Sequence, residues 1–272
     1  MATLKNILTV TALLCAALIT HAQKLPVLQQ GSLRAPAMIK IDGKATEWGD
    51  KFQAYNKATD IFYTIANDDY NIYLIIKATD VGIINKIIKG RVTFAINTAG
   101  KKTTDDAVAV SYPLFDRKDV PYISMKDKPR LIEGNAASVL AADSFSNANN
   151  RRLAEKSKFI KITGVKGVDT LISVYNEDGI KAAAAFDNQM AYTCEFAISL
   201  KLLGLSANDQ RKLAYNITVN PLPFDDVPGI NIERNTKGDI VSINIDKNQM
   251  PPNYRGLTAA TDFWGEYTLA KK

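Results

Sequence analysis

Two neighbouring apolar runs stand out in the first third of the sequence. Ile61 to Ala66 and Ile72 to Ala78 are rich in Ile, Tyr and Phe, and the residues between them, Asn67 to Asn71, tolerate turn geometry. This pattern predicts a β-hairpin. Because apolar residues fall on both faces of the pair, we expect both faces to be covered and the hairpin to lie centrally in a sheet.

The segment before this hairpin carries weaker signals. Residues 23–37 are expected to form an extended lead-in, and Ile39 to Ile41 predicts a short strand that ends at Asp42-Gly43. Trp48 follows in a segment of polar and small residues. We expect Trp48 to close one end of a core, because a large aromatic side chain contributes most when it is buried.

Most of the remaining chain shows alternation or turn-bounded apolar runs typical of strands. The predicted strands cover residues 91–97, 107–112, 159–165, 170–175, 180–186, 191–199, 213–219 and 263–269. The strands between 159 and 199 have the spacing of an antiparallel meander. Residues 80–90 form a connector for which a helix is one option, and residues 200–205 predict a short turn of helix ended by Gly204.

Between residues 113 and 157 the β pattern stops for longer than an ordinary loop. Residues 135–145 and 147–157 have short helical character. We expect this insertion to pack over the apolar second face of the central hairpin. The sequence therefore predicts an all-β protein, a single antiparallel β-sandwich domain of jelly-roll type over residues 38–272 with a partly helical insertion.

Residues 1–22 have the pattern of a secretory signal peptide. Lys5 precedes the apolar run from Ile7 to Ile19, and small residues suited to cleavage lie before Gln23. The run is short for a membrane span. We expect the chain to be exported and to reside in the periplasm, on the cell surface or outside the cell.

A lipoprotein signal centred on Cys15 is the alternative reading of this N-terminus. Leu14 disfavours it, because such signals have a small residue at that position. No later segment is long and apolar enough to span a bilayer, so no membrane span is expected in the mature chain.

Signal removal takes away the only histidine, His21, and one of the two cysteines, Cys15. The mature chain then excludes Ser-His-Asp triads, Cys-His pairs, His-ligated haem and the usual histidine-containing zinc sites. Cys194 shares a predicted strand face with Tyr192 and Phe196, and we expect it to be a buried apolar residue without a disulfide. This chemistry favours a protein that is not an enzyme.

The net charge is mildly positive. The full chain has 34 basic and 28 acidic residues, a net charge of +6, and loss of Lys5 leaves +5. Apart from Lys101-Lys102 and Arg151-Arg152 the basic residues are scattered, whereas a nucleic-acid surface needs a concentrated basic stripe. We expect no nucleic-acid partner and a monomeric protein.

Several short features recur here in the order found in one family. They are Ile41-Asp42-Gly43, Trp48, Asn67-Asp68 before Ile72-Tyr73-Leu74, the Glu195-bearing strand that leads into Leu203-Gly204-Leu205, and the final strand at 263–269. This order resembles the family-nine carbohydrate-binding modules and the wider DOMON-like β-sandwich group. The resemblance covers the opening third, about residues 191–220 and the final strand, and leaves out the insertion. It implies a non-catalytic module whose partner is a glycan or oligosaccharide.

The family's sites hold a sugar between two tryptophans, and polar side chains bind its hydroxyls. The first tryptophan should fall at residues 86–90, which hold no aromatic residue. For the second, Trp264 alternates onto the more polar face of the final strand, and Asn253, Tyr254 and Arg255 lie on a loop upstream. The sequence leaves open a second role for Trp264, packing beneath the insertion.

Calcium is the family's usual ion, held by loop oxygen atoms. Asp105 and Asp106 are candidate ligands, as are Asp225 and Asp226, although none of them has the spacing of a dedicated calcium loop, and solvated loop acids are the alternative. Two other functions stay open. One is a carboxylate-based glycan hydrolase, although adjacent acids do not predict a separation of about 5 to 10 Å across a cleft. The other is an envelope scaffold or protein-binding sandwich without a sugar ligand.

Overall fold

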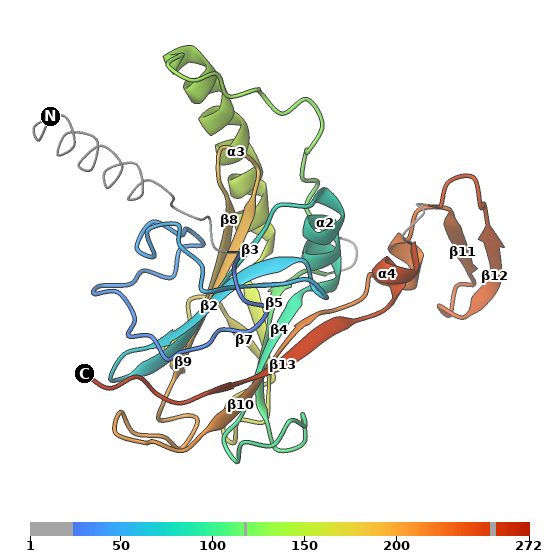
Figure 1. The fold of residues 1–272 in the computed structure, drawn as a ribbon. Helices are drawn as coiled ribbons and strands as arrows, with labels where there is room; N and C mark the ends of the chain where they lie inside the picture. The colour runs from blue at the N-terminus through green and yellow to red at the C-terminus, as the bar shows by residue number, and fades with distance from the viewer. Residues whose placement is uncertain (1–23, 117–118, 251–253) are drawn as a thin grey trace, which may run out of the picture.

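Two antiparallel sheets form a sandwich in the computed structural model, which describes residues 24–116, 119–250 and 254–272 (Figure 1). The five-stranded sheet has the order β1 (Ala54–Asn56), β2 (Ile61–Asn67), β3 (Asn71–Ala78), β9 (Tyr192–Ser199) and β8 (Ile180–Phe186). The six-stranded sheet has the order β13 (Thr261–Tyr267), β10 (Leu213–Val219), β4 (Val92–Asn97), β5 (Val108–Leu114), β6 (Phe159–Thr163) and β7 (Leu171–Ser173). The predicted fold class is confirmed.

The remaining elements lie outside these sheets. They are α2 (Val81–Gly90), α3 (Ala136–Lys156), the 3-10 helix η1 (Phe224–Asp226), a separate hairpin of β11 (Ile230–Arg234) and β12 (Ile240–Ile245), and α4 (Tyr254–Thr258). Asp80 caps α2 by accepting a hydrogen bond from the Ile83 amide, so the helical option for this connector is confirmed. The insertion contains one helix of 21 residues where the sequence predicts two short ones.

The core forms where the inner faces of the two sheets meet. The predicted hairpin is β2 and β3, and its inner face buries Ile65 and Leu74 completely. The hydroxyls of Tyr63 and Tyr215 hydrogen-bond across the sandwich at 3.0 Å. Gly265 of β13 lets Tyr215 approach, since a Cβ there would lie 2.2 Å from its ring. As the alternation predicts, both faces of the central hairpin are buried.

The second face of the hairpin is covered by residues 33–52, so the prediction that the insertion packs there is wrong. From here on, the lead-in means residues 24–53, the whole described segment before β1. A second apolar cluster joins Ala45 and Trp48 to Tyr73, Ile75 and the outer face of β9, with Leu33, Ile39, Ile41 and Phe52 packed against it. The insertion helix α3 instead packs along the edge strand β8, where Asn150 exchanges hydrogen bonds of 2.9 and 2.6 Å with the backbone of Phe186. Its buried stripe is too narrow and polar to cover a sheet.

Two smaller predictions are also wrong. Ile39 to Ile41 is not a strand, because it lies over a sheet face and has no strand edge to pair with. The strands from 159 to 199 are not one meander, since β6 and β7 join the six-stranded sheet and β8 and β9 join the other. The short turn predicted at residues 200–205 is present as successive turns with hydrogen bonds between residues three apart, such as Leu203 to Leu200 at 3.1 Å, and it ends at Gly204, whose φ is +64°.

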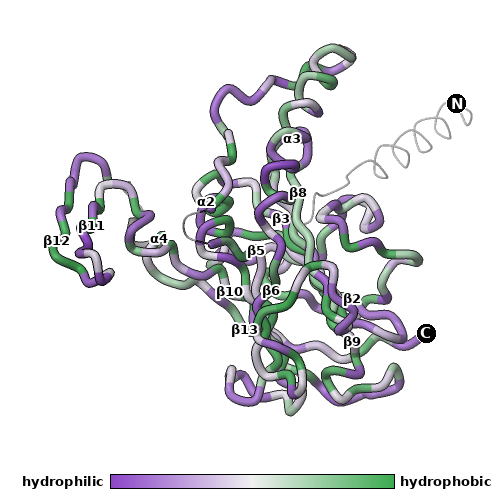
Figure 2. Tube along the Cα trace, turned by 180° about the vertical axis from the view of Figure 1, so that it is seen from behind, coloured by the Kyte–Doolittle hydropathy of each residue, from purple (hydrophilic) through white to green (hydrophobic). Residues whose placement is uncertain are grey.

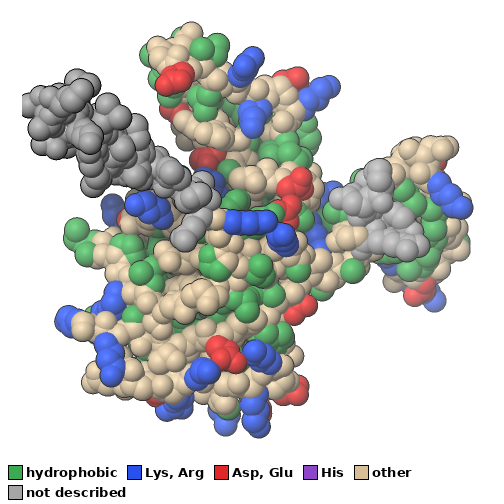
Figure 3. All heavy atoms as spheres, in the orientation of Figure 1, with side chains coloured by type: hydrophobic (Ala, Val, Ile, Leu, Met, Phe, Trp, Pro, Cys, Tyr) green, Lys and Arg blue, Asp and Glu red, His purple; other side chains and the backbone are tan. Residues whose placement is uncertain are grey.

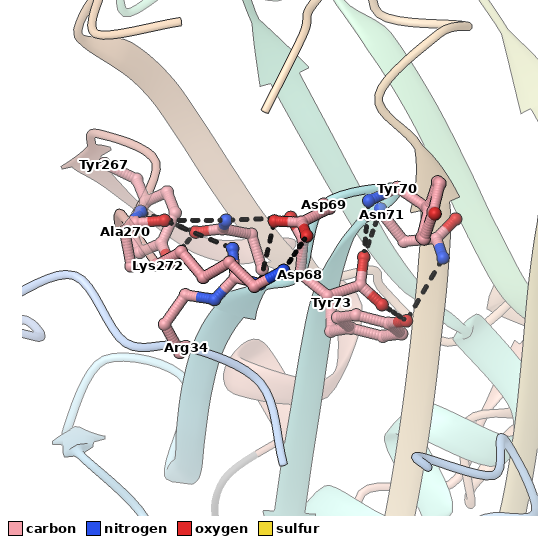
Figure 4. A network of polar contacts seen from close by, with 10 residues as sticks. Arg34, Asp68, Asp69, Tyr70, Asn71, Tyr73, Tyr267, Ala270 and Lys272 are labelled. Atoms are coloured by element: carbon pink, nitrogen blue, oxygen red, sulfur yellow. Dashed lines mark hydrogen bonds and ion pairs between the residues drawn. The ribbon is translucent and has the colours of Figure 1, made fainter. Parts of the chain in front are cut away.

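A polar network ties the C-terminal end to the β2–β3 turn (Figure 4). The buried Asn67 side chain accepts hydrogen bonds from the Tyr267 hydroxyl at 2.9 Å and from the Ala270 amide at 2.7 Å. Asp68 caps the turn by accepting from the amides of Tyr70 and Asn71, and it also accepts from the Tyr73 hydroxyl. Asn67 and Asp68 therefore have structural roles: Asn67 fixes the C-terminal end to β2, and Asp68 stabilises the β2–β3 turn. On the exposed side, Asp69 pairs with Arg34 at 2.9 Å and with Lys272 at 3.4 Å.

Candidate functional site

Three further residues of the family resemblance, Gly43, Trp48 and Glu195, meet in one buried cluster. Glu195 on the outer face of β9 accepts hydrogen bonds from Trp48 Nε1 at 2.9 Å and from the backbone amides of Gly43 and Asp42 at 2.8 and 3.0 Å. Trp48 is buried, as predicted. A Cβ on Gly43 would lie 2.3 Å from the Ala184 carbonyl carbon, so only glycine fits there. The hydrogen bonds of Glu195 thus fix the lead-in to the five-stranded sheet.

Glu195 has a perturbed ionisation but a structural role. Burial raises its pKa to about 7, although the three hydrogen-bond donors partly oppose this rise. A raised carboxyl pKa is typical of a general acid. Glu195 is, however, only 1% exposed and its oxygens already accept three hydrogen bonds. It does not support the hydrolase alternative, because a substrate cannot reach it.

Trp264 lies on the outer face of the six-stranded sheet, as the alternation on the final strand predicts. Its neighbours on β13 lie on the core side of the strand, where Phe263 is buried and Gly265 lies against the Tyr215 ring. Trp264 is half-buried and lies directly opposite Asn216 of β10. Asn216 donates to the carboxylate of Asp262 at 2.7 Å. Trp264 is thus an outward aromatic residue with a carboxylate and an amide beside it.

This outer face continues as a ladder of small polar side chains across three further strands. Thr218 donates to Asn216 Oδ1 at 2.6 Å on β10. Beyond it, Asn220 donates to the Thr93 hydroxyl of β4 at 2.9 Å, and Thr93 shares a hydrogen bond of 2.8 Å with Ser111 of β5. We call these residues together with Trp264 and Asp262 the polar face. Sequence analysis missed this ladder, although the outward positions of its predicted strands already held Thr, Ser and Asn.

The other predicted ligand residues are placed only in part. Tyr254 and Arg255 belong to α4, but their side chains lie outside the described part of the chain, and Asn253 lies outside the described residues altogether. Where the family has its first tryptophan, α2 instead carries Lys86. Its side chain is buried and Nζ donates to the Thr261 hydroxyl at 3.2 Å, and burial lowers its pKa.

Most of the candidate calcium ligands already contact a neighbouring side chain. Asp105 is exposed and its carboxylate accepts from the Thr103 hydroxyl at 2.9 Å, while its neighbour Asp106 is exposed at the same turn. Asp225 forms an ion pair with Arg234 at 3.1 Å, and Asp226 lies 3.9 Å from Lys89. Within residues 24–116, 119–250 and 254–272, no group of three Asp, Glu, His or Cys side chains is arranged to hold a metal ion. The calcium assignment stays a prediction.

A polar pocket of about 310 Å³ lies between α3, the β8–β9 turn and the lead-in. One wall holds Lys77 and Asp187, which form an ion pair at 2.9 Å, and another holds Asp143, which accepts from Asn188 at 3.1 Å. Thr193 on its floor is 4% exposed. The insertion therefore builds a concave polar surface remote from Trp264, on the other sheet.

No helix in the described part of the chain combines the length and apolarity needed to cross a membrane. No protein-family model matches the sequence, and no curated protein does. Among solved structures, the chain is similar to a family 9 carbohydrate-binding module from Caldicellulosiruptor kristjanssonii in complex with glucose, at 10% sequence identity and a TM-score of 0.38, with 89% of this chain and 95% of that chain covered.

Proposed function

We propose that this protein is an exported, non-catalytic module that binds a glycan on the polar face of the six-stranded sheet. The observation that carries the proposal is the outward Trp264 beside the hydrogen-bonded ladder of Asp262, Asn216 and Thr218. An aromatic ring can lie against the C–H surface of a pyranose, while neighbouring carboxylate, amide and hydroxyl groups exchange hydrogen bonds with its hydroxyls.

The polar face differs from the opposite surface of the sandwich in a way that supports this role. The outer face of the five-stranded sheet is apolar and is covered by the lead-in. The outer face of the six-stranded sheet instead carries the partly exposed Trp264, Thr218 and Thr93, and the buried Asn216 and Ser111 hydrogen-bond to the two threonines from beneath. A ladder of side chains that both donate and accept suits sugar hydroxyls, which also do both. The polar pocket under α3, which Thr193, Asp143 and Lys77 line, is a second candidate surface for the same ligand class.

Replacing Trp264 with alanine is expected to weaken glycan binding by about 1 to 3 kcal/mol, the range measured for other ligands that stack on an aromatic side chain. The loss corresponds to about a five- to 150-fold rise in Kd. The measurement is a glycan array with the chain from Gln23 onward, followed by calorimetric titration of the best ligand with and without calcium.

Matched variants locate the site. Tyr70→Ala removes an aromatic residue that is 76% exposed at the β2–β3 turn, and it should leave affinity unchanged. Thr193→Val and Asp143→Asn alter the α3 pocket alone. If Trp264→Ala binds normally and these two variants bind more weakly, the ligand lies in the pocket. If the array detects no glycan at all, the proposed function is wrong.

A further inference from the structure

A second pocket, of about 420 Å³, lies at the edge of the six-stranded sheet where the lead-in passes the end of β13. Its walls are residues 28–32 of the lead-in, residues 265–268, Lys102 of the β4–β5 loop and Lys212 just before β10. This end of the sandwich is the lower one in Figure 1, and Figure 3 shows basic side chains gathered along it. Figure 2 shows hydrophilic colouring on its loops. We call this polar pocket the edge pocket.

The edge pocket adjoins the polar face through Glu266. Asp262, Trp264 and Glu266 alternate onto the outer side of β13. Glu266 therefore lies next to Trp264 in this outward row, about 7 Å farther along the strand. A ligand chain that covers the Trp264 ring and continues toward the end of β13 enters the edge pocket.

The charges of the edge pocket do not balance. Glu266 lies 2.9 Å from Lys212 Nζ through Oε2 and 3.3 Å from Lys102 Nζ through Oε1. Lys212 and Lys102 lower the pKa of the Glu266 carboxyl group, which is therefore ionised at neutral pH. Of the described residues that line the pocket, no other carries a charge. Two ammonium groups and one carboxylate leave the pocket positive.

Both lysines keep hydrogen-bonding capacity beyond their contact with Glu266. An ammonium group has three N–H donors, and the side chains of Lys102 and Lys212 are 52% and 66% exposed. A second anionic group in the pocket can therefore reach both lysines from the solvent side. Glu266 competes with such a group for the same two partners.

The opposite wall of the pocket is held in place by hydrogen bonds. The Gln29 side chain accepts from the Ile65 amide and donates to the Ile65 carbonyl, both at 2.8 Å. Three residues on, the Ser32 hydroxyl donates to the Thr268 carbonyl. The lead-in thus forms a fixed wall facing the two lysines.

We propose that the glycan on the polar face is anionic, and that one of its acidic groups binds Lys102 and Lys212 in the edge pocket. The acidic group is a uronic-acid carboxylate or a sulfate ester, because an ammonium group is a point charge that accepts either. The inference rests on the proposed function, since Trp264 must hold the neighbouring sugar unit.

Paired polymers that differ in their acidic groups test the inference. The chain from Gln23 onward is titrated with polygalacturonate and its methyl ester, and with dextran sulfate and dextran. In at least one pair the acidic member should bind about three- to 30-fold more tightly, the gain expected from two exposed ion pairs. Added salt should reduce that preference, because it screens exposed charges. The pair that responds distinguishes a carboxylate from a sulfate, and equal affinities within both pairs overturn the inference.

Charge variants locate the acidic group. Lys212→Gln and Lys102→Gln should each raise the Kd of the acidic polymer about two- to fivefold and leave that of a neutral one unchanged. Glu266→Gln should instead lower the Kd of the acidic polymer by a similar factor, because it removes the competing carboxylate. The matched control, Lys181→Gln on the edge strand β8 of the other sheet, should have no effect. Thermal unfolding verifies that each variant is folded.

Trp264→Ala separates this inference from the proposed function. Weaker binding of the acidic polymer by both Trp264→Ala and the lysine variants supports the two together. If Trp264→Ala weakens binding while the lysine variants and Glu266→Gln change nothing, the inference is wrong and the proposed function stands. If the lysine variants weaken binding and Trp264→Ala does not, or if no polymer and no arrayed glycan binds, both are wrong.

Discussion

Replacing Glu195 with alanine is expected to lower the free energy of unfolding by about 3 to 5 kcal/mol at pH 5, as when one partner of a buried polar network is removed. The variant leaves the Trp48 indole N–H and the amides of Gly43 and Asp42 without their acceptor. The lead-in over the five-stranded sheet should loosen as a result. Urea denaturation followed by tryptophan fluorescence measures the loss.

The same residue predicts how stability depends on pH. Burial raises the pKa of Glu195 from 4.5 to about 7 in the folded protein. A raised carboxyl pKa means that the folded state holds the proton more tightly than the unfolded state. The contribution to stability is therefore complete below pH 4.5 and is lost as pH rises through about 7, by about 3 kcal/mol in all.

Glu195→Gln is the matched control for this pH dependence. Glutamine is uncharged at every pH, so this variant should lack the wild-type decline toward pH 8. Its NH2 group must face at least one of the three N–H donors, so it should be less stable than the wild type at pH 5 by an amount that does not depend on pH. The difference between the two unfolding free energies isolates this residue. A wild type that instead gains stability over Glu195→Gln between pH 4.5 and 7 would show that the three donors hold the carboxylate charged.

Asn67→Ala is expected to destabilise the fold by about 2 to 4 kcal/mol. The side chain is fully buried, and it links the Tyr267 hydroxyl and both backbone groups of Ala270 to the end of β2. Its removal leaves buried polar groups without partners, each at a cost of about 1 to 3 kcal/mol. Besides weaker resistance to urea, the Ala270 amide should exchange with solvent deuterium much faster.

Asp69→Ala provides the comparison, because Asp69 lies two positions along the same turn. Asp69 and its partner Arg34 are each about one-third exposed, and its second partner Lys272 is 86% exposed (Figure 4). Exposed pairs of this kind contribute less than about 1 kcal/mol. If both substitutions had equal effects, the role assigned to Asn67 would be wrong.

Much of the polar face was predictable from local pattern. The alternation of the final strand correctly turned Trp264 outward, and the same rule applied to 213–219 and 91–97 turns Asn216 and Thr93 to that surface. The contact between Glu195 and Gly43 was not predictable, because it joins residues 152 positions apart. The family resemblance marked both residues, but it did not show that they touch.

The β11–β12 hairpin shows a different limit. Its strands are short and mix Ile with Asn, Glu and Ser, so they lack the apolar density that revealed β2 and β3. The pocket under α3 was equally hidden, since its walls come from the lead-in, the insertion and a strand turn. Such surfaces form only when distant segments pack together.

The sequence by itself determined where most strands lie, which faces of the hairpin are buried and, if the signal peptide is removed, that no histidine takes part in function. These properties follow from the two-residue period of a strand and from residue inventory, which are local. Only the tertiary structure decided that β7 and β8 belong to different sheets, that the lead-in covers the second face, and that β11 and β12 form a hairpin apart from the sandwich. Those outcomes depend on which distant segments bury the most apolar surface together, and no local pattern encodes that competition.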